Sequence, residues 1–521
     1  MRVALLDRTI RSRGAFSSTS HLPAPTGGWN TRDSLAEMDP LDAPLLNNWF
    51  PREGQCQLRG GSSEWATGMS GTVKTLMQYQ AAVAAGVGEF FAVTDAGIYD
   101  ISITGAVGAV VQALTNGYFN SINITNSAGT AFLWGCNGTD APVHYNGSAW
   151  AAPSITGVTA ANLIYPTLFK HRIFVVEKDT MNVWYLPVDS VAGAAGKLPY
   201  GSFFRRGGYV MSISNWTLDS GLGPDDLFAT VSSEGELAIF SGTDPSSADT
   251  WAIVGVWNVG RPIGRRCFKM LGADVVLLTE NGAFPLSRLL KSGNINFATA
   301  LSNKIQPSFT DAVREVGLST PGWEAVNYPK NDALIVNIPM ATGVSSRQFV
   351  MNTVTGAWCS FTGWEAYCFE VFDEDLYFGG AGGKVFLAWD GESDVGTDIV
   401  ATSHQAYNYF GTRTQLKLVN LFRVLMSYNA AVEFSWAVSP DFTTVPLNSL
   451  IPRGVTLTGE LWDQGFWDTF YWAGTSERFK NWKAASHYPG YALALWLQIS
   501  TKDASVAWSG TDFILADGGA M

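Results

Sequence analysis

Between about residues 70 and 395, a short apolar run, a glycine-bearing turn and a second apolar run recur seven times. Asn-Gly and Asp-x-Gly turns between apolar runs indicate β-hairpins, because their turn positions need the positive φ that glycine and asparagine adopt readily. The units start about 40 to 60 residues apart. Their first residues are Phe90, Phe132, Ile173, Leu227, Val275, Leu334 and Leu376.

A repeat of this length built from hairpins predicts a β-propeller of six or seven four-stranded blades over residues 70–395. A radial arrangement also protects the edges that so many short strands would otherwise expose. Two stacked β-sandwiches remain the alternative architecture.

Composition supports an all-β fold class. The chain has 54 Gly, 22 Pro and 20 Trp among 521 residues, and only 15% of its residues are charged. An average globular chain has about 25% charged residues. A turn-rich, aromatic-rich and charge-poor chain favours many hairpins over helices.

The pattern changes on both sides of the repeat. After residue 396 the apolar runs become longer, and residues 491–500 and 505–514 read as two closing strands, so we expect a C-terminal β-sandwich-like domain over 396–521. Residues 1–69 read as an N-terminal arm and docking segment, in which Pro40, Pro44 and Pro51 exclude a long helix. Trp49 and Phe50 are expected to anchor this segment to the body.

The start of the arm is basic. Arg2, Arg8, Arg11 and Arg13 stand against Asp7, which gives a local charge of +3. Such a stretch is either a loose terminus or an arm that docks on a neighbouring subunit or an acidic partner. The candidates for a subunit or partner interface are Arg2, Arg11, Arg13, Trp29, Trp49, Phe50, Arg261, Arg265 and Arg266. The clustered arginines at 261–266 are expected to pair either with acidic residues of this chain or with an acidic neighbouring subunit.

The whole chain carries a net charge of −12. A surface that grips duplex DNA should be basic, because affinity comes mainly from neutralising phosphates. An acidic wall repels DNA instead, so the chain could lie beside nucleic acid without holding it.

Cysteine usage and hydropathy limit the cellular setting. The five cysteines are odd in number and form no CxxC pair, so we expect buried free thiols rather than disulfides or a zinc site. The N-terminus lacks the apolar stretch of a secretory signal, and no run is long enough to span a bilayer. We therefore expect a soluble protein made in the cytoplasm, without a membrane span.

Motifs that carry catalysis are absent from the sequence. There is no HExxH, GxGxxG before a helix, GxxxxGK[ST] or GxSxG. We therefore predict no enzyme activity, no catalytic residues, no metal site and no cofactor. Asp463 and Asp468 lie among Trp462, Phe466, Trp467 and Trp472, a composition that would suit sugar stacking or hydrolysis, although core packing or a subunit interface is the favoured interpretation.

Two stretches resemble a bacteriophage family. They are GGWNTRDSLAEMDPLDAPLLNNWFPREGQCQLRGG at 27–61 and IFSGTDPSSADTWAIVGVWNVGRPIGRRCFKMLGADVVLLTENGAFPLS at 239–287. Both are similar to tail nozzle or tail-hub (tail tubular) structural proteins of short-tailed double-stranded DNA phages. The aromatic C-terminal region gives a weaker likeness.

The resemblance implies a structural virion protein of the viral tail, made in the cytoplasm of the host bacterium. In such nozzles each subunit carries a propeller, and six copies form a tube below the head-to-tail adaptor. Fibres or spikes attach at the side, and the genome passes through the lumen during ejection without specific binding. The alternatives are a receptor- or glycan-binding tail component that uses the 462–472 aromatics, and a propeller glycan hydrolase.

Overall fold

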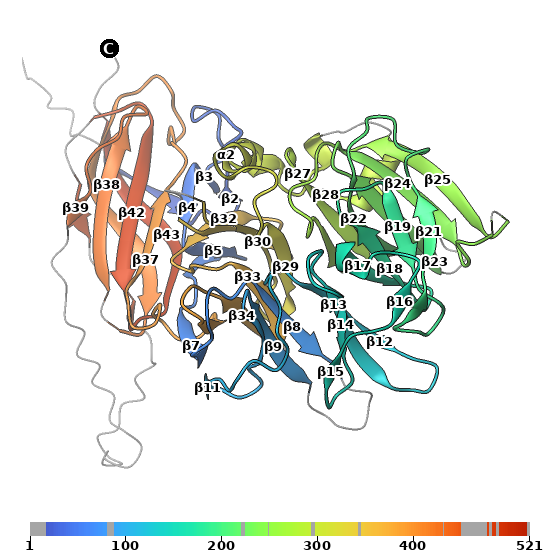
Figure 1. Ribbon diagram of the computed structural model, residues 1–521. Helices are drawn as coiled ribbons and strands as arrows, with labels where there is room; N and C mark the ends of the chain where they lie inside the picture. Colours follow the sequence, from blue (N-terminus) through green and yellow to red (C-terminus); the bar gives the residue numbers. More distant parts are fainter. Residues whose placement is uncertain are drawn as a thin grey trace, which may run out of the picture.

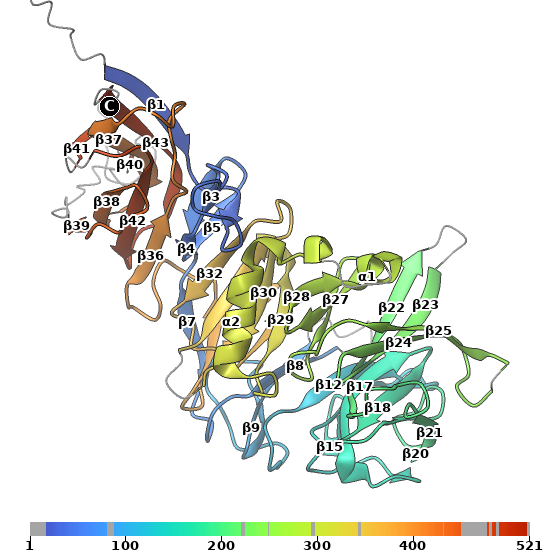
Figure 2. The same ribbon diagram turned by 90° about the horizontal axis from the view of Figure 1, so that it is seen from above.

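The computed structural model describes residues 17–80, 88–219, 224–247, 249–292, 297–341, 345–430, 432–449, 477–478, 482–485 and 489–517. Within these ranges the chain folds mostly into β-strands, and its α-helices are α1 (Leu286–Ser292) and α2 (Gln306–Val316). The all-β fold class is therefore confirmed. Neither of these helices is both long and apolar enough to cross a membrane. Figures 1 and 2 show a ring of small sheets beside a second group of longer strands.

Seven antiparallel sheets follow one another along the chain. The first four contain β8 (Thr75–Tyr79), β9 (Glu89–Thr94) and β10 (Gly97–Asp100); β12 (Asn120–Thr125), β13 (Ala131–Cys136), β14 (Val143–Tyr145) and β15 (Trp150–Ala151); β17 (Leu163–Phe169), β18 (Arg172–Glu177), β19 (Asn182–Tyr185) and β21 (Gly196–Pro199); and β22 (Val210–Asp219), β23 (Pro224–Ser232), β24 (Glu236–Gly242) and β25 (Trp251–Asn258).

The remaining three sheets complete the series. They contain β26 (Phe268–Leu271), β27 (Asp274–Thr279) and β28 (Gly282–Pro285); β29 (Glu324–Tyr328), β30 (Ala333–Ile338), β31 (Arg347–Asn352) and β32 (Trp358–Thr362); and β33 (Cys368–Phe372), β34 (Asp375–Gly379) and β35 (Val385–Ala388) with β7 (Ser62–Thr67). The predicted hairpin units coincide with the second and third strands of these sheets.

The first strand of each sheet contacts the first strand of the next. The contacts run from β8 to β12, β17, β22, β26, β29 and β33, and from β33 back to β8. The sheets therefore form a closed ring with their first strands innermost (Figure 1). Strand β7 pairs antiparallel with β35, so residues from the N-terminal segment complete the seventh sheet.

Two larger sheets face each other beside the ring. One contains β37 (Lys417–Tyr428), β43 (Val506–Asp517), β6 (Gln55–Leu58), β5 (Trp49–Arg52) and β1 (Ser17–Pro23). The other contains β36 (Ile399–His404), β42 (Leu493–Thr501), β38 (Glu433–Pro440) and β39 (Asn448–Ser449). Their apolar faces meet in a buried core, where the ring centroids of Phe422 and Trp436 lie 4.4 Å apart.

A short strand from the N-terminal segment connects the ring to these larger sheets. Strand β4 (Leu45–Asn47) pairs with β32 on one side and β36 on the other. The result is a continuous nine-stranded sheet from β29 to β39. The boundaries at 69/70 and 395/396 stay predictions, and strand pairings cross both of them.

His404 lies in β36 and its ring contacts Trp496, with ring centroids 5.8 Å apart. Its Nε2 atom is buried without a hydrogen-bond partner, and burial lowers the pKa of His404 from 6.5 to about 4. The folded state therefore binds this proton less readily than the unfolded state. Stability from this group is present above pH 6.5 and is lost as the pH falls from about 6.5 to about 4.

A His404→Phe variant should lose less stability over this pH window than the unaltered protein. Between pH 7 and pH 4 the two proteins should differ by about 1–3 kcal/mol in the free energy of unfolding that they lose, as measured by urea unfolding. His171→Phe is the matched control, because the His171 side chain is 79% exposed. Equal pH dependence of His404→Phe and the unaltered chain would contradict the assignment.

Candidate functional site

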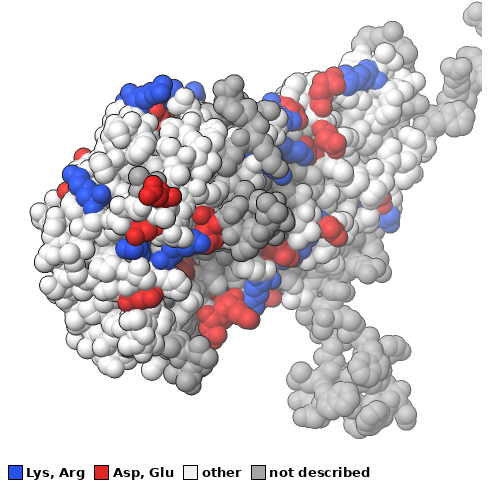
Figure 3. Space-filling view, turned by 90° about the vertical axis from the view of Figure 1, so that its right-hand side faces the viewer, with Lys and Arg blue, Asp and Glu red and all other residues white. Residues whose placement is uncertain are grey.

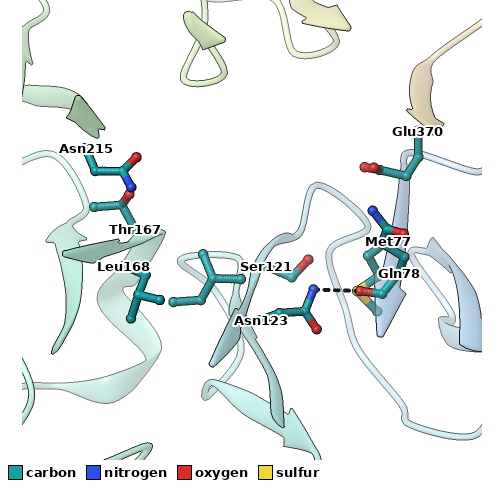
Figure 4. A pocket seen from close by; sticks show the side chains of 9 residues that line it. Met77, Gln78, Ser121, Asn123, Thr167, Leu168, Asn215 and Glu370 are labelled. Carbon is teal, nitrogen blue, oxygen red and sulfur yellow. Dashed lines mark hydrogen bonds between the residues drawn. The ribbon is translucent and has the colours of Figure 1, made fainter. Parts of the chain in front are cut away.

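A cavity of about 330 Å³ lies at the centre of the ring. Its walls come from the innermost strands of five sheets, β8, β12, β17, β22 and β33 (Figure 4). The residues that line it are Met77, Gln78, Ser121, Ile122, Asn123, Thr167, Leu168, Asn215 and Glu370. Most of these side chains are polar, so the cavity suits water or small polar ligands rather than apolar ones.

The polar side chains gather on two sides of the cavity. Glu370 and Gln78 lie on one side, and Thr167 and Asn215 face them from the other (Figure 4). Asn123 is held by the backbone, because its Nδ2 donates to the carbonyl of Gln78 at 3.0 Å and its Oδ1 accepts from the Gln80 amide at 3.0 Å. Its role is therefore to join β8 to β12.

Glu370 is the acid of this cavity. Burial raises the pKa of Glu370 from 4.5 to about 7, which the nearby Lys269 partly opposes and Glu324 reinforces. A carboxyl with this pKa exchanges its proton near neutral pH. Because the folded state binds the proton more tightly, the stability from Glu370 is present below pH 4.5 and is lost as the pH rises through 7.

Glu370→Gln should therefore stabilise the protein at pH 8 and leave it unchanged at pH 4. We expect a gain of about 1–3 kcal/mol at pH 8, since one pKa unit corresponds to about 1.4 kcal/mol and the partial exposure of Glu370 reduces the effect. Chemical denaturation at both pH values measures the gain. Glu365→Gln, an exposed carboxylate on the preceding loop, is the control. A gain of equal size at both pH values would sink this explanation.

Arg266, an expected interface residue, lies instead at the centre of the ring. Its Nη1 donates to Glu324 Oε2 at 2.7 Å, its Nη2 to Thr75 Oγ1 at 2.6 Å, and its Nε to Asn120 Oδ1 at 3.1 Å. Glu324 is 6% exposed, and its other oxygen accepts the backbone amide of Phe369. Of the two alternatives for Arg266, the structure therefore shows pairing with an acidic residue of the same chain.

The other two clustered arginines differ from each other. Arg265 is mostly buried, donates to Asp179 Oδ1 at 3.0 Å and stacks on Tyr209. The Arg261 side chain is 52% exposed and lies 3.5 Å from Glu280. Of these two side chains, that of Arg261 offers more surface to a partner.

The three aromatic residues expected at an interface also belong to the core. Trp49 and Phe50 are buried, and the Trp49 ring lies 5.6 Å from that of Trp508 in β43. Trp29 contacts Phe349 of β31, with ring centroids 5.1 Å apart. These side chains attach the N-terminal segment to the body and leave almost no surface for another subunit, which corrects the interface expectation.

Several predicted residues lie outside the described residues. They are Arg2, Arg11, Arg13, Trp462, Phe466, Trp467 and Trp472. All five cysteines are buried free thiols, and burial raises the pKa of Cys267 to about 12. Within the ranges that the structure covers, no group of three or more His, Cys, Asp or Glu side chains is placed to hold a metal ion.

None of the cavity residues was predicted from the sequence. They lie on the innermost strands, which precede each predicted hairpin unit and lie outside the pattern that marked those units. The available signal was the alternation of polar and apolar residues along Ser121, Ile122, Asn123 and Ile124, which places the polar side chains on one face of the strand.

Comparisons with known proteins give a limited result. No protein family model and no curated protein matches the chain. Similar solved structures include the designed protein Ika8, with a TM-score of 0.35, 10% identity, and coverage of 62% of this chain and 99% of Ika8. Raptor from Chaetomium thermophilum has a TM-score of 0.40 and 12% identity over 63% of this chain and 29% of Raptor. BBS1N, crystallised with ARL6DN, has a TM-score of 0.37 and 10% identity over 65% of this chain and 98% of BBS1N. At these TM-scores the similarity supports no conclusion about function.

Proposed function

We propose that this chain is a structural subunit of the tail nozzle of a short-tailed double-stranded DNA phage. The subunit would be a seven-bladed β-propeller with a C-terminal β-sandwich, assembled as six copies around a DNA conduit below the head-to-tail adaptor. The observation that carries the proposal is the nine-stranded sheet, which makes the ring and the larger sheets one continuous body. Such a body suits a part that must keep its shape in an assembly.

The propeller interpretation rests on the order of contacts in the ring. Seven sheets of three or four strands surround a centre with their first strands innermost, as blades do. Strand β7 then supplies the outer strand of the last sheet from the other end of the sequence. This closure ties the two ends of the repeat together.

The stretches that resemble the phage family occupy defined places in this architecture. Residues 27–61 contain β4, β5 and β6, which connect the ring to the larger sheets. Residues 239–287 contain β25 to β28 together with most of β24. The resemblance therefore covers the junction and one side of the ring.

The charge of the chain is compatible with a conduit. Its net charge is −12. Charged side chains at the ring end are scattered in small groups among uncharged residues, without a broad basic surface (Figure 3). An assembly with this charge would let DNA slide rather than hold it.

Cryo-electron microscopy of the purified chain, alone and mixed with the neck proteins of the particle, tests the proposal. A sixfold tube around an open channel is the expected result. Duplex binding at low salt is the second measurement, and weak binding with little salt dependence is expected. A lone subunit in both samples, or a steep salt slope of about 0.9 per neutralised phosphate, would contradict the proposal.

A further inference from the structure

Strand β25 forms the outer edge of the fourth sheet, and its exposed surface is apolar. It pairs with β24 along its inner edge, and in the described part of the chain no strand pairs with its outer edge. Its outward side chains include Ile253, Val254 and Val256, which are 40%, 52% and 40% exposed. An open strand edge with exposed aliphatic side chains is a template for another strand.

The other outer strands of the ring are not open in this way. Strands β10, β15, β21 and β28 are only two to four residues long. Strand β32 is covered by β4, and β7 pairs with the short strand β11 (Gly105–Ala106). Strand β25 has eight residues. It is therefore the longest of the outer strands in the ring.

The strand is held firmly from its inner side. The Trp251 ring stacks on Phe240, with centroids 5.8 Å apart, and contacts Phe174 at 6.0 Å. Trp257 packs against the main core. The edge is therefore presented by a fixed strand rather than by a loose loop, so a partner strand would not have to order it first.

We propose that residues 1–16 of one copy of this chain add a strand to the outer edge of β25 in the next copy. This inference rests on the oligomer that the proposed function requires, and it names the contact between subunits. A strand that pairs along an open edge gains backbone hydrogen bonds, while its side chains determine which partner fits.

The position of the two surfaces favours contact between copies. Strand β1, which follows directly after residue 16, lies at one end of the molecule in Figure 2, and β25 lies at the opposite end. A contact between opposite ends of successive copies is heterologous, and a heterologous contact can close into a ring.

The arm has a suitable length and charge. Eight residues suffice to pair along β25, and sixteen are present before β1. The arm carries a local charge of +3 and contains Val3, Leu5 and Ile10, which can cover the exposed aliphatic side chains.

The loop from 243 to 250, which leads into β25, contains Asp244 and Asp249 and no Lys or Arg. Asp244 lies 3.4 Å from Arg172, and Asp249 is exposed.

An experiment that mixes two variants of this chain tests the contact. One variant lacks residues 1–16 and keeps an open β25. The other carries Val254→Lys and Val256→Lys and keeps the arm. Each variant alone should be monomeric by light scattering, with association at least tenfold weaker than in the unaltered chain. An equimolar mixture should form a 1:1 heterodimer and nothing larger, because one arm and one edge remain complementary.

Two other outcomes would overturn the inference. If the arm-deleted chain still associates, the contact does not need the arm. If the doubly substituted chain still associates, β25 is not the docking edge. Val354→Lys, which charges a 63% exposed valine in the turn between β31 and β32, is the matched control and should leave association unchanged. A heterodimer in the mixture, together with no sixfold tube from the unaltered chain, would support this contact and contradict the nozzle.

Discussion

Replacing Arg59 with alanine is expected to lower the free energy of unfolding by about 3–5 kcal/mol, the range found when one partner of a buried ion pair is removed. The Arg59 side chain is 1% exposed and pairs with Asp394, whose side chain is 11% exposed. Its Nη2 lies 2.5 Å from Asp394 Oδ2, and its Nη1 lies 2.9 Å from Asp394 Oδ1. Alanine would leave this carboxylate without its cation.

Arg59 also satisfies groups from three parts of the chain. Its Nε donates to Asn48 Oδ1 at 3.0 Å, and its Nη2 donates to the carbonyl of Thr362 at 2.6 Å. The guanidinium lies over the Trp364 ring, 5.1 Å from its centroid. Because Asn48 belongs to the N-terminal segment and Thr362 to β32, the loss should loosen the junction between the ring and the larger sheets.

Thermal unfolding followed by calorimetry measures this effect. Arg413→Ala is the matched control, since Arg413 forms a bidentate pair with Glu37 and both side chains are more than half exposed. The control should leave the midpoint temperature unchanged, because solvent screens an exposed pair. Similar losses for the two variants would show that Arg59 acts only as a surface charge.

The second large effect is expected at the centre of the ring. Arg266 precedes β26 and contacts Thr75 of β8, Asn120 of β12 and Glu324 of β29, and Glu324 accepts the amide of Phe369 in β33. One ion pair therefore connects the innermost strands of five sheets. Arg266→Met should cost about 3–5 kcal/mol, because it leaves the buried Glu324 carboxylate unpaired.

A double-mutant cycle separates this coupling from simple packing. Glu324→Gln alone should also destabilise the protein, since it breaks the same pair. The Arg266→Met, Glu324→Gln double variant should be about 1–3 kcal/mol more stable than the sum of the single losses predicts, because no uncompensated charge remains. Urea unfolding of the four proteins gives the coupling energy. Additive losses would contradict the central role of the pair.

The sequence was informative where apolar side chains alternate around a glycine turn. Strands β27 and β28 illustrate this, because Val275 to Leu278 fill the core on one side of Asn281-Gly282 and Phe284 fills it on the other. The innermost strands could not be predicted in the same way. They face a polar cavity and meet their neighbours side by side, so β12 needs fewer apolar residues than β13.

Helix α2 shows a signal that the sequence analysis did not use. Phe309, Ala312, Val313 and Val316 recur at helical spacing and are all buried. The helix packs on the sixth sheet, where the ring of Phe309 lies 6.0 Å from that of Phe349. It is only 11 residues long and lies between two of the predicted hairpin units.

The candidate site depended on contacts that spacing along the chain cannot reveal. Arg266 has partners at Glu324, 58 residues away, and at Thr75, 191 residues away. In the sequence it belongs to a basic cluster, which favours an interface interpretation. Only closure of the ring brings the Glu324 carboxylate and the Thr75 hydroxyl to the Arg266 guanidinium, and this makes Arg266 an internal residue.

The pairing of β1 with β43 has a consequence for biosynthesis. Strand β43 accepts β37, β6 and β1 as neighbours, so the N-terminal strands lack their partner until residue 517 has left the ribosome. At about 5–20 residues per second, that wait lasts tens of seconds. In a prematurely terminated chain, the edges of β1 and β6 that pair with β43 would stay unpaired. An interaction that requires the folded N-terminal segment would therefore exclude incomplete translation products.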